Sequence, residues 1–179
     1  GYGLNAAVRE TLNCPLTGAD IILLGAGGAA RGAAVECLQR GCASLWIANR
    51  TRENLDALLS RLRPIAAGIP VQGFAPDTPP ARLPFGALVI NATSSGLRPA
   101  APAPLDLGAL PRPAAVYDMI YNPPQTALLR AAAALGLPHA NGLAMLVHQG
   151  AKSLEIWSGV PATQTAPVMA AAARAALGR

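Results

Sequence analysis

The stretch IILLGAGGAARGAAVECLQRG, residues 21–41, places four apolar residues directly before a glycine cluster and then continues into an alanine-rich segment. A short apolar run before a glycine turn is typical of a buried parallel strand, and alanine favours a helix after it. The pattern G-x-G-x-x-A at Gly25, Gly27 and Ala30 fits a dinucleotide-binding turn. Gly25 permits the tight turn, Gly27 lets the backbone approach a pyrophosphate, and Ala30 allows close helix packing. A plain strand-to-helix turn is the alternative interpretation, but the flanking segments favour dinucleotide binding.

The segments on either side of this stretch continue the alternation of strands and helices. Strands are expected at 20–25, 44–49, 71–75, 87–96 (ending in a small polar loop) and 114–123, and helices at 2–13, 28–41, 51–63, 124–136, 142–157 and 163–177. Proline interrupts 76–86 and 99–113, which we interpret as surface loops. The alternation predicts an α/β fold, a Rossmann-type doubly wound parallel sheet with flanking helices. We divide the chain into a connecting helix (1–14), a Rossmann domain (15–141) and C-terminal helices (142–179).

Composition excludes several classes of protein. Although 52% of the 179 residues are hydrophobic, no apolar run approaches the roughly 20 residues of a membrane span. No signal peptide is apparent at the N-terminus, so we expect a cytoplasmic protein. Three cysteines without a C-x-x-C pair, and two histidines away from any cysteine or carboxylate cluster, predict neither a disulfide framework nor a metal site.

The positive charge of the chain points to a small phosphate-bearing ligand. The net charge is +5, but the arginines are scattered and no basic run is interleaved with aromatic residues. We therefore expect no nucleic-acid partner; a nucleic-acid-binding protein is the weakest of the alternatives.

The residues after the second expected strand indicate which dinucleotide binds. NAD-specific sites place a carboxylate there for the ribose hydroxyl groups, but this chain has Asn49, Arg50, Thr51 and Arg52. Arginine can grip a phosphate through two hydrogen bonds. The pattern predicts NADP as cofactor. Alternatively, Asn49 or Thr51 caps a helix and the arginines are merely solvated.

Five segments together resemble the shikimate dehydrogenase family, in the family's order and spacing. They are GAGGAARG, NRT, NATSSGL (91–97), DMIYNPPQTALL (118–129) and NGLAMLVHQGAKSLEIWSG (141–159). The resemblance covers nearly the whole chain and implies NADP-dependent reduction of 3-dehydroshikimate to shikimate, in aromatic amino acid biosynthesis.

The resemblance implies site residues at matching positions. Those implied to bind cofactor are Gly25, Ala26, Gly27, Gly28 and Ala29 at the pyrophosphate; Asn49, Arg50 and Thr51 at the 2′-phosphate; Ala92, Thr93 and Ser94 beside the ribose; and Met119 and Gly142 near the nicotinamide. Tyr121 and Gln149 are implied to contact the substrate. Many relatives carry a second basic residue where Asn54 stands, and we expect Arg52 to replace it.

From the residues alone, several of these positions could instead have purely structural or solvent-exposed roles. Tyr121 could be a core phenol and Gln149 a surface amide. Lys152 could face the site, although a solvated lysine is the simpler interpretation, and Asp118 is interpreted as a structural hydrogen-bond acceptor. On a helix, His148 points about 100° away from Gln149 and is not expected to be catalytic.

No catalytic residue is assigned to this chain. Family members protonate the substrate carbonyl through a lysine and an aspartate of an N-terminal substrate domain. The opening GYGLNAAV resembles the sequence that directly follows this aspartate, so we expect cofactor binding without turnover by the chain alone. Alternatives are a quinate/shikimate dehydrogenase and a non-catalytic nucleotide-binding module. Val168 and Met169 on the last helix are expected to be exposed and to permit a homodimer.

Overall fold

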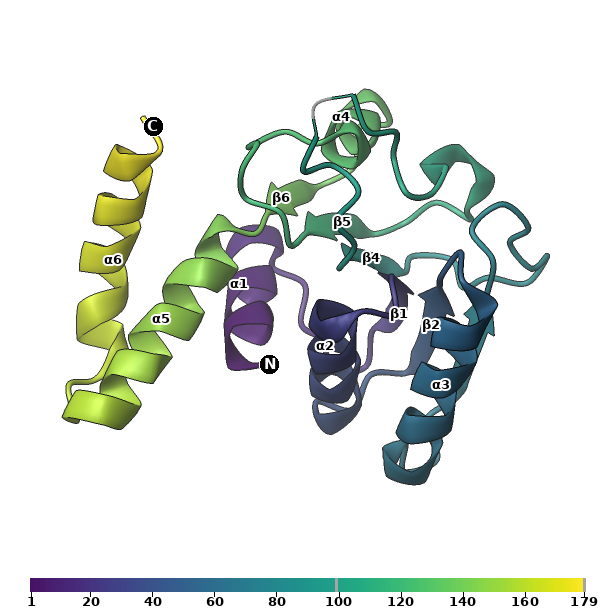
Figure 1. Ribbon diagram of the computed structural model, residues 1–179, viewed down its shortest axis with the longest axis horizontal. Coiled ribbons are helices and arrows are strands. Elements are labelled where there is room, and N and C mark those ends of the chain that lie inside the picture. Colours follow the sequence, from purple (N-terminus) through teal and green to yellow (C-terminus); the bar gives the residue numbers. More distant parts are fainter. Residues whose placement is uncertain (99, 179) are drawn as a thin grey trace.

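The computed structural model describes residues 1–98 and 100–178, and within them six parallel strands form one sheet (Figure 1). The strands are β1 (Asp20–Leu24), β2 (Ser44–Ala48), β3 (Val71–Phe74), β4 (Leu88–Asn91), β5 (Ala115–Asp118) and β6 (His139–Asn141). Their order across the sheet is β3-β2-β1-β4-β5-β6. This is the order of a doubly wound Rossmann sheet, so the predicted fold class is confirmed.

Helices cover both faces of the sheet and extend beyond one edge. The α-helices are α1 (Tyr2–Leu12), α2 (Gly28–Gln39), α3 (Arg52–Leu62), α4 (Ala127–Ala134), α5 (Leu143–Ser158) and α6 (Ala162–Ala176). Single 3₁₀ turns follow α3 (η1, Arg63–Ile65) and lie in the predicted loop 99–113 (η2, Leu107–Ala109); Pro99 of that loop lies outside the described residues. The predicted helices agree with these bounds to within about three residues.

The apolar run before the glycines supplies both halves of the core. Ile21 and Leu23 pack in a cluster with α1, α2 and α3, whereas Ile22 and Leu24 pack in a second cluster with α4 and η2. All four side chains are at most 1% exposed. Because successive residues of a strand point to opposite faces, a central strand covered on both sides must be apolar throughout.

The strand β6 was not predicted from the sequence. It has only three residues, His139–Asn141, which range from exposed to half-buried, and it pairs with β5 from Val116↔His139 to Asp118↔Asn141. A short strand at the edge of a sheet carries neither an apolar run nor a clear alternation, so no pattern marked it.

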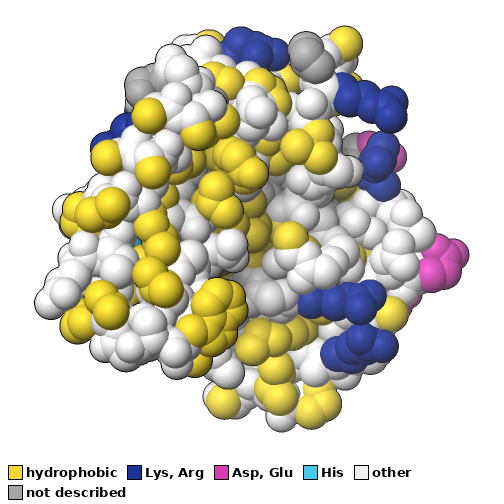
Figure 2. All heavy atoms as spheres, turned by 60° about the vertical axis from the view of Figure 1, so that its left-hand side comes forward, with side chains coloured by type: hydrophobic (Ala, Val, Ile, Leu, Met, Phe, Trp, Pro, Cys, Tyr) yellow, Lys and Arg dark blue, Asp and Glu magenta, His cyan; other side chains and the backbone are white. Residues whose placement is uncertain are grey.

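The last two helices project from the β6 edge of the sheet (Figure 1). α5 packs against α1, and α6 packs mainly against α5. Apolar side chains spread over the face that carries these helices (Figure 2); they include Ile156, Trp157, Val160 and Val168, exposed by 40% to 81%. Val168 is exposed as predicted, but Met169 is half-buried and faces Gly150 of α5.

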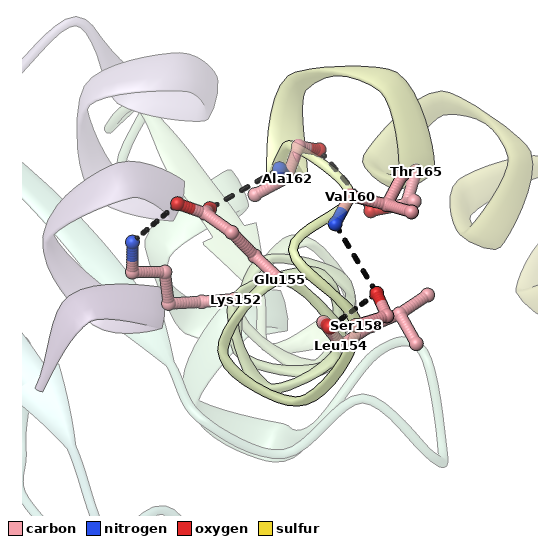
Figure 3. A network of polar contacts seen from close by, with 7 residues as sticks. All are labelled: Lys152, Leu154, Glu155, Ser158, Val160, Ala162 and Thr165. Carbon is pink, nitrogen blue, oxygen red and sulfur yellow. Dashed lines mark hydrogen bonds and ion pairs between the residues drawn. The ribbon is translucent and has the colours of Figure 1, made fainter.

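Glu155 ties the start of α6 to α5 (Figure 3). One carboxylate oxygen accepts a hydrogen bond from Lys152 Nζ at 2.8 Å, and the other accepts one from the Ala162 backbone N–H at 3.1 Å. Pro161, the N-cap residue of α6, provides no side-chain cap. Glu155 therefore acts as the cap of α6 from the preceding helix.

We expect the attachment of α6 to weaken in acid. The hydrogen bond from Lys152, and secondarily that from Ala162, lowers the pKa of Glu155. A lowered pKa means that the carboxylate stabilises the folded state above the unfolded-state pKa, near 4.3, and that this contribution is lost as the pH falls through the folded-state pKa. Hydrogen exchange of the α6 amides, corrected for intrinsic rates, should therefore show protection near about pH 7 that declines towards about pH 3.

Glu155→Gln is the matched variant for this prediction. It should show weaker α6 protection than the wild type at neutral pH and a smaller decline in acid. Equal protection of the two proteins across the pH range would contradict the capping role.

Candidate functional site

Most of the predicted site residues follow the carboxyl ends of the strands. The last residues of the central strands are aligned with one another, through the pairs Leu24↔Ala48, Leu24↔Asn91 and Asn91↔Asp118. All the strands are parallel, so the loops that follow them leave the sheet at the same level. β1 and β4 are neighbours where the strand order reverses, which is where doubly wound sheets bind ligands.

The glycine loop after β1 leaves room for a ligand at the start of α2. Gly25 has φ +109° and lies against the backbone of Ala92, so this position requires glycine. A Cβ at Gly27 or Gly28, by contrast, would meet no protein atom within 4 Å. Gly27 is the N-cap of α2 and provides no side-chain cap, and the first turn of α2 contains no acidic residue. The backbone N–H groups of this turn can therefore bind an anion.

The loop after β2 presents an arginine and a second uncapped helix. Thr51 is the N-cap residue of α3, but its side chain makes no capping hydrogen bond. The Asn49 amide instead donates to the Thr51 carbonyl at 2.8 Å. Arg50 is exposed and forms no hydrogen bond or ion pair with any residue that the structure describes. Side-chain capping, the alternative role considered for Asn49 and Thr51, is therefore absent.

Arg52 has a partner already. Its Nε donates to both carboxylate oxygens of Asp56, at 2.9 and 3.1 Å, one helical turn further along α3. Both side chains are exposed, so the pair itself adds little to stability. Of the two arginines beside Thr51, Arg52 is therefore paired with a carboxylate and Arg50 is not.

A buried polar network shapes the two loops after β4 and β5. The carboxylate of Asp118 accepts hydrogen bonds from Asn91 Nδ2 (2.9 Å), Thr126 Oγ1 (2.6 Å) and the Ile120 N–H (3.0 Å). The Asn91 side-chain oxygen accepts from both the N–H and the hydroxyl of Thr93. Burial raises the pKa of Asp118, and its three donors oppose that rise. This confirms the structural role predicted for Asp118.

Asn91 was quoted in the sequence only as the start of a motif. It is fully buried, and it links the loop that holds Ala92 and Ser94 to the end of β5. A polar residue that ends an otherwise apolar strand was the available signal, because a buried amide needs partners.

Met119 and Gly142 lie in direct contact, as do the strands that precede them. The Gly142 N–H donates to the Ile120 carbonyl, and a Cβ at Gly142 would lie only 2.0 Å from the Met119 carbonyl oxygen. Gly142 is buried at the start of α5. Packing therefore explains why glycine is required here, apart from any contact with a cofactor.

We expect Gly142→Ala to destabilise the protein by about 1–3 kcal/mol or more, because the new methyl group must displace backbone rather than a flexible side chain. Thermal or urea unfolding measures this loss. Gly150→Ala is the control, since the nearest atom there is the flexible Met169 sulfur at 3.5 Å; comparable losses in both variants would contradict the contact.

The two predicted substrate residues come from different elements. Tyr121 lies in the loop after β5 and is 37% exposed, so it is not a core phenol. Gln149 is exposed on α5, and its backbone packs against Gly3 of α1. A Cβ at Gly3 would lie 2.7 Å from the Met145 carbonyl oxygen and 3.1 Å from the Gln149 N. Gly3 therefore allows α1 to approach α5 closely where Gln149 projects.

The remaining ionisable candidates have structural partners. Lys152 is bound to Glu155, and its Nζ lies 5.5 Å from the centre of the Tyr2 ring, so it is not simply solvated. His148 pairs with Glu10, which joins α5 to α1. Among the residues that the structure describes, no three His, Cys, Asp or Glu side chains are grouped as metal ligands would be.

Comparisons with known proteins match this chain to one family. Residues 142–174 match the family model of the shikimate 5′-dehydrogenase C-terminal domain. The chain is 41% identical over 142 residues to the shikimate dehydrogenase (NADP⁺) of Methylobacterium radiotolerans, an alignment that covers 79% of this chain and 49% of that protein. The chain is thus similar to shikimate dehydrogenases over most of its own length. It spans about half to three fifths of the length of such curated relatives.

Solved structures of a shikimate dehydrogenase and of a 5-ketofructose reductase share this fold. A shikimate dehydrogenase in complex with NADP⁺ superposes with a TM-score of 0.81 at 31% identity, covering 97% of this chain and 59% of the other. The 5-ketofructose reductase of Gluconobacter sp. strain CHM43 superposes with a TM-score of 0.83 at 35% identity, covering 97% and 61%. In the described part of the chain, no helix is both long enough and apolar enough to cross a membrane.

Proposed function

We propose that this chain is the NADP-binding part of a shikimate dehydrogenase, which reduces 3-dehydroshikimate to shikimate. The observation that carries the proposal is the pairing of two helix N-termini without side-chain caps, those of α2 and α3, with an unpaired Arg50 in a loop, residues 49–51, that contains no acid. Such a surface suits a ligand with two separate phosphate groups and disfavours the free ribose hydroxyls of NAD.

The residues present fit the cofactor. Gly27 and Gly28, where an added Cβ would meet open space, admit the pyrophosphate next to the N–H groups of α2. Arg50, with Asn49 and Thr51, would bind the 2′-phosphate. The loop from Ala92 to Ser94, fixed by the buried Asn91, would border the ribose. Met119 and Gly142 would border the nicotinamide. When bound, the nicotinamide would supply a hydride to the carbonyl carbon of the substrate.

Tyr121 and Gln149 would orient the substrate. A phenol hydroxyl and an amide can bind hydroxyl and carboxylate groups, which are the groups that shikimate offers. Asp118 is committed to three donors and Lys152 to Glu155, so neither is a candidate to protonate the carbonyl oxygen. We assign that proton to a lysine–aspartate pair outside these residues, in a substrate domain that α5 and α6 would face. The division into a connecting helix (1–14), a Rossmann domain (15–141) and C-terminal helices (142–179) remains part of this proposal.

A chimera tests the activity. The Thermosynechococcus vestitus shikimate dehydrogenase aligns over 61% of its length with 99% of this chain at 40% identity, and its unaligned substrate-domain part would be fused to Gly1. We expect shikimate-dependent reduction of NADP by the chimera and none by this chain alone. The substrate assignment would be contradicted by a folded chimera that binds NADP but does not oxidise shikimate, and in which Tyr121→Phe and Gln149→Ala leave the affinity for substrate unchanged.

Other substrates are a second outcome of the same assay. Structural relatives include a 5-ketofructose reductase and a quinate dehydrogenase in complex with NAD. Quinate and 5-ketofructose would therefore be assayed beside shikimate, each with NADP and NAD. The missing acid after β2 supports NADP over NAD for any of them.

We further propose self-association and a cytoplasmic location. The exposed Ile156, Trp157, Val160 and Val168 could pair two copies of the isolated chain. Concentration-dependent sedimentation that is lost in Trp157→Ser would support the homodimer. Cys37 and Cys42, buried as free thiols, are compatible with a reducing compartment.

A further inference from the structure

The two arginines that flank Thr51 differ in what they bind. Arg50 is unpaired among the described residues, whereas Arg52 donates from Nε to both oxygens of Asp56. Arg52 is the first residue of α3, so it lies directly beside the loop that would hold the 2′-phosphate. Position alone would permit both arginines to share that phosphate.

Asp56 opposes such sharing in two ways. A phosphate can reach the free Nη groups of Arg52, because only Nε is bound to Asp56, but the Asp56 carboxylate then lies close to it. A phosphate that takes Nε as well must displace that carboxylate, which remains one helical turn away. Exposed pairs of this kind contribute little, equivalent to about a 1.5- to fivefold change in an equilibrium. Repulsion between the carboxylate and a phosphate dianion acts over about a Debye length, roughly 8–10 Å at moderate salt.

We propose that Asp56 is a specificity-determining residue that withholds Arg52 from the 2′-phosphate. Arg50 is then the one arginine that contributes to the preference for NADP over NAD, beside Asn49 and Thr51. The preference is smaller than two arginines would give. This inference rests on the proposed function, because it concerns the same cofactor site.

The experiment uses the full chain and a probe that carries only the adenosine end of the cofactor. Adenosine 2′,5′-bisphosphate and 5′-AMP would be titrated calorimetrically into the wild type, Asp56→Asn, Arg52→Gln and the double variant. Glu53→Gln is the matched control, since Glu53 is an exposed acid in the first turn of α3 that pairs with no arginine in the described residues.

We expect Asp56→Asn to bind the bisphosphate about threefold more tightly or better, with 5′-AMP affinity unchanged. Arg52→Gln should change the wild-type affinity less than about twofold, yet remove the whole gain in the Asp56→Asn background. The inference is overturned if Asp56→Asn binds both probes as the wild type does, if its gain survives the loss of Arg52, or if Glu53→Gln gives an equal gain.

The two proposals fail in distinguishable ways. A wild type that prefers the bisphosphate but does not respond to Asp56→Asn overturns only the role of Asp56. A wild type that binds the bisphosphate no better than 5′-AMP contradicts the NADP site itself, and the role of Asp56 with it.

Discussion

Replacing Arg50 with alanine is expected to weaken NADP binding by roughly 10- to 100-fold, which corresponds to about 1.5–3 kcal/mol for a charge-assisted contact with phosphate. Arg50 is an unpaired cation in the loop after β2, and in the proposed site its loss would leave the 2′-phosphate beside Asn49 and Thr51. NAD lacks that phosphate, so its affinity should change little. Calorimetric titration of the variant with both nucleotides measures the two effects.

The control for this prediction is Arg61→Ala, which removes an equally cationic side chain from the far end of α3, the helix that follows the loop of Arg50. It changes the net charge by the same amount but leaves the β2 loop intact. If Arg61→Ala weakened NADP binding as strongly as Arg50→Ala, the effect would be one of net charge, and the local phosphate site would be wrong.

Gly27→Val is expected to abolish measurable nucleotide binding while the fold persists. The φ of Gly27 is −78°, which any residue can adopt, and an added Cβ meets no protein atom within 4 Å. The valine side chain would instead occupy the space in front of the first turn of α2, where the pyrophosphate would lie. We expect affinity for both NADP and NAD to fall by at least about 10-fold, and stability to change by less than about 1 kcal/mol.

Gly32→Ala is the matched control on the same helix. Gly32 is exposed inside α2 and an added Cβ there also meets open space, so alanine should leave binding unchanged and stabilise the protein by up to about 1 kcal/mol. Unaltered nucleotide affinity in Gly27→Val would show that the open space before α2 is not the pyrophosphate site. Unfolding of Gly27→Val would contradict the expectation that the fold tolerates a side chain at this position.

The fold could be predicted because each deciding signal was local. The four consecutive apolar residues Ile21–Leu24 pack alternately on the two faces of the sheet. The glycines that follow them mark the turn from this strand into α2. β6 could not be found in this way, since its three residues at the edge of the sheet carry no periodic apolar pattern. Its presence follows from tertiary pairing with β5.

Parts of the candidate site depend on contacts that single motifs do not show. It was predictable that the loops lie together at the carboxyl ends of the strands, because the sheet is parallel. The restriction at Gly142 arises from the Met119 backbone, and the fixation of the β4 loop arises from Asn91 and Asp118, which are 27 positions apart. The pairing of Arg52 with Asp56 was visible as an i, i+4 spacing, and it changes what Arg52 can do for a cofactor.

The preference of the wild-type chain for NADP over NAD tests the central claim most directly. Both nucleotides would be titrated calorimetrically into the same preparation at one salt concentration, because phosphate contacts depend on salt. We predict saturable NADP binding at least about tenfold tighter than NAD binding. Equal affinities, or tighter binding of NAD, would contradict the assignment of the β2 loop as a 2′-phosphate site and with it the proposed role of this chain.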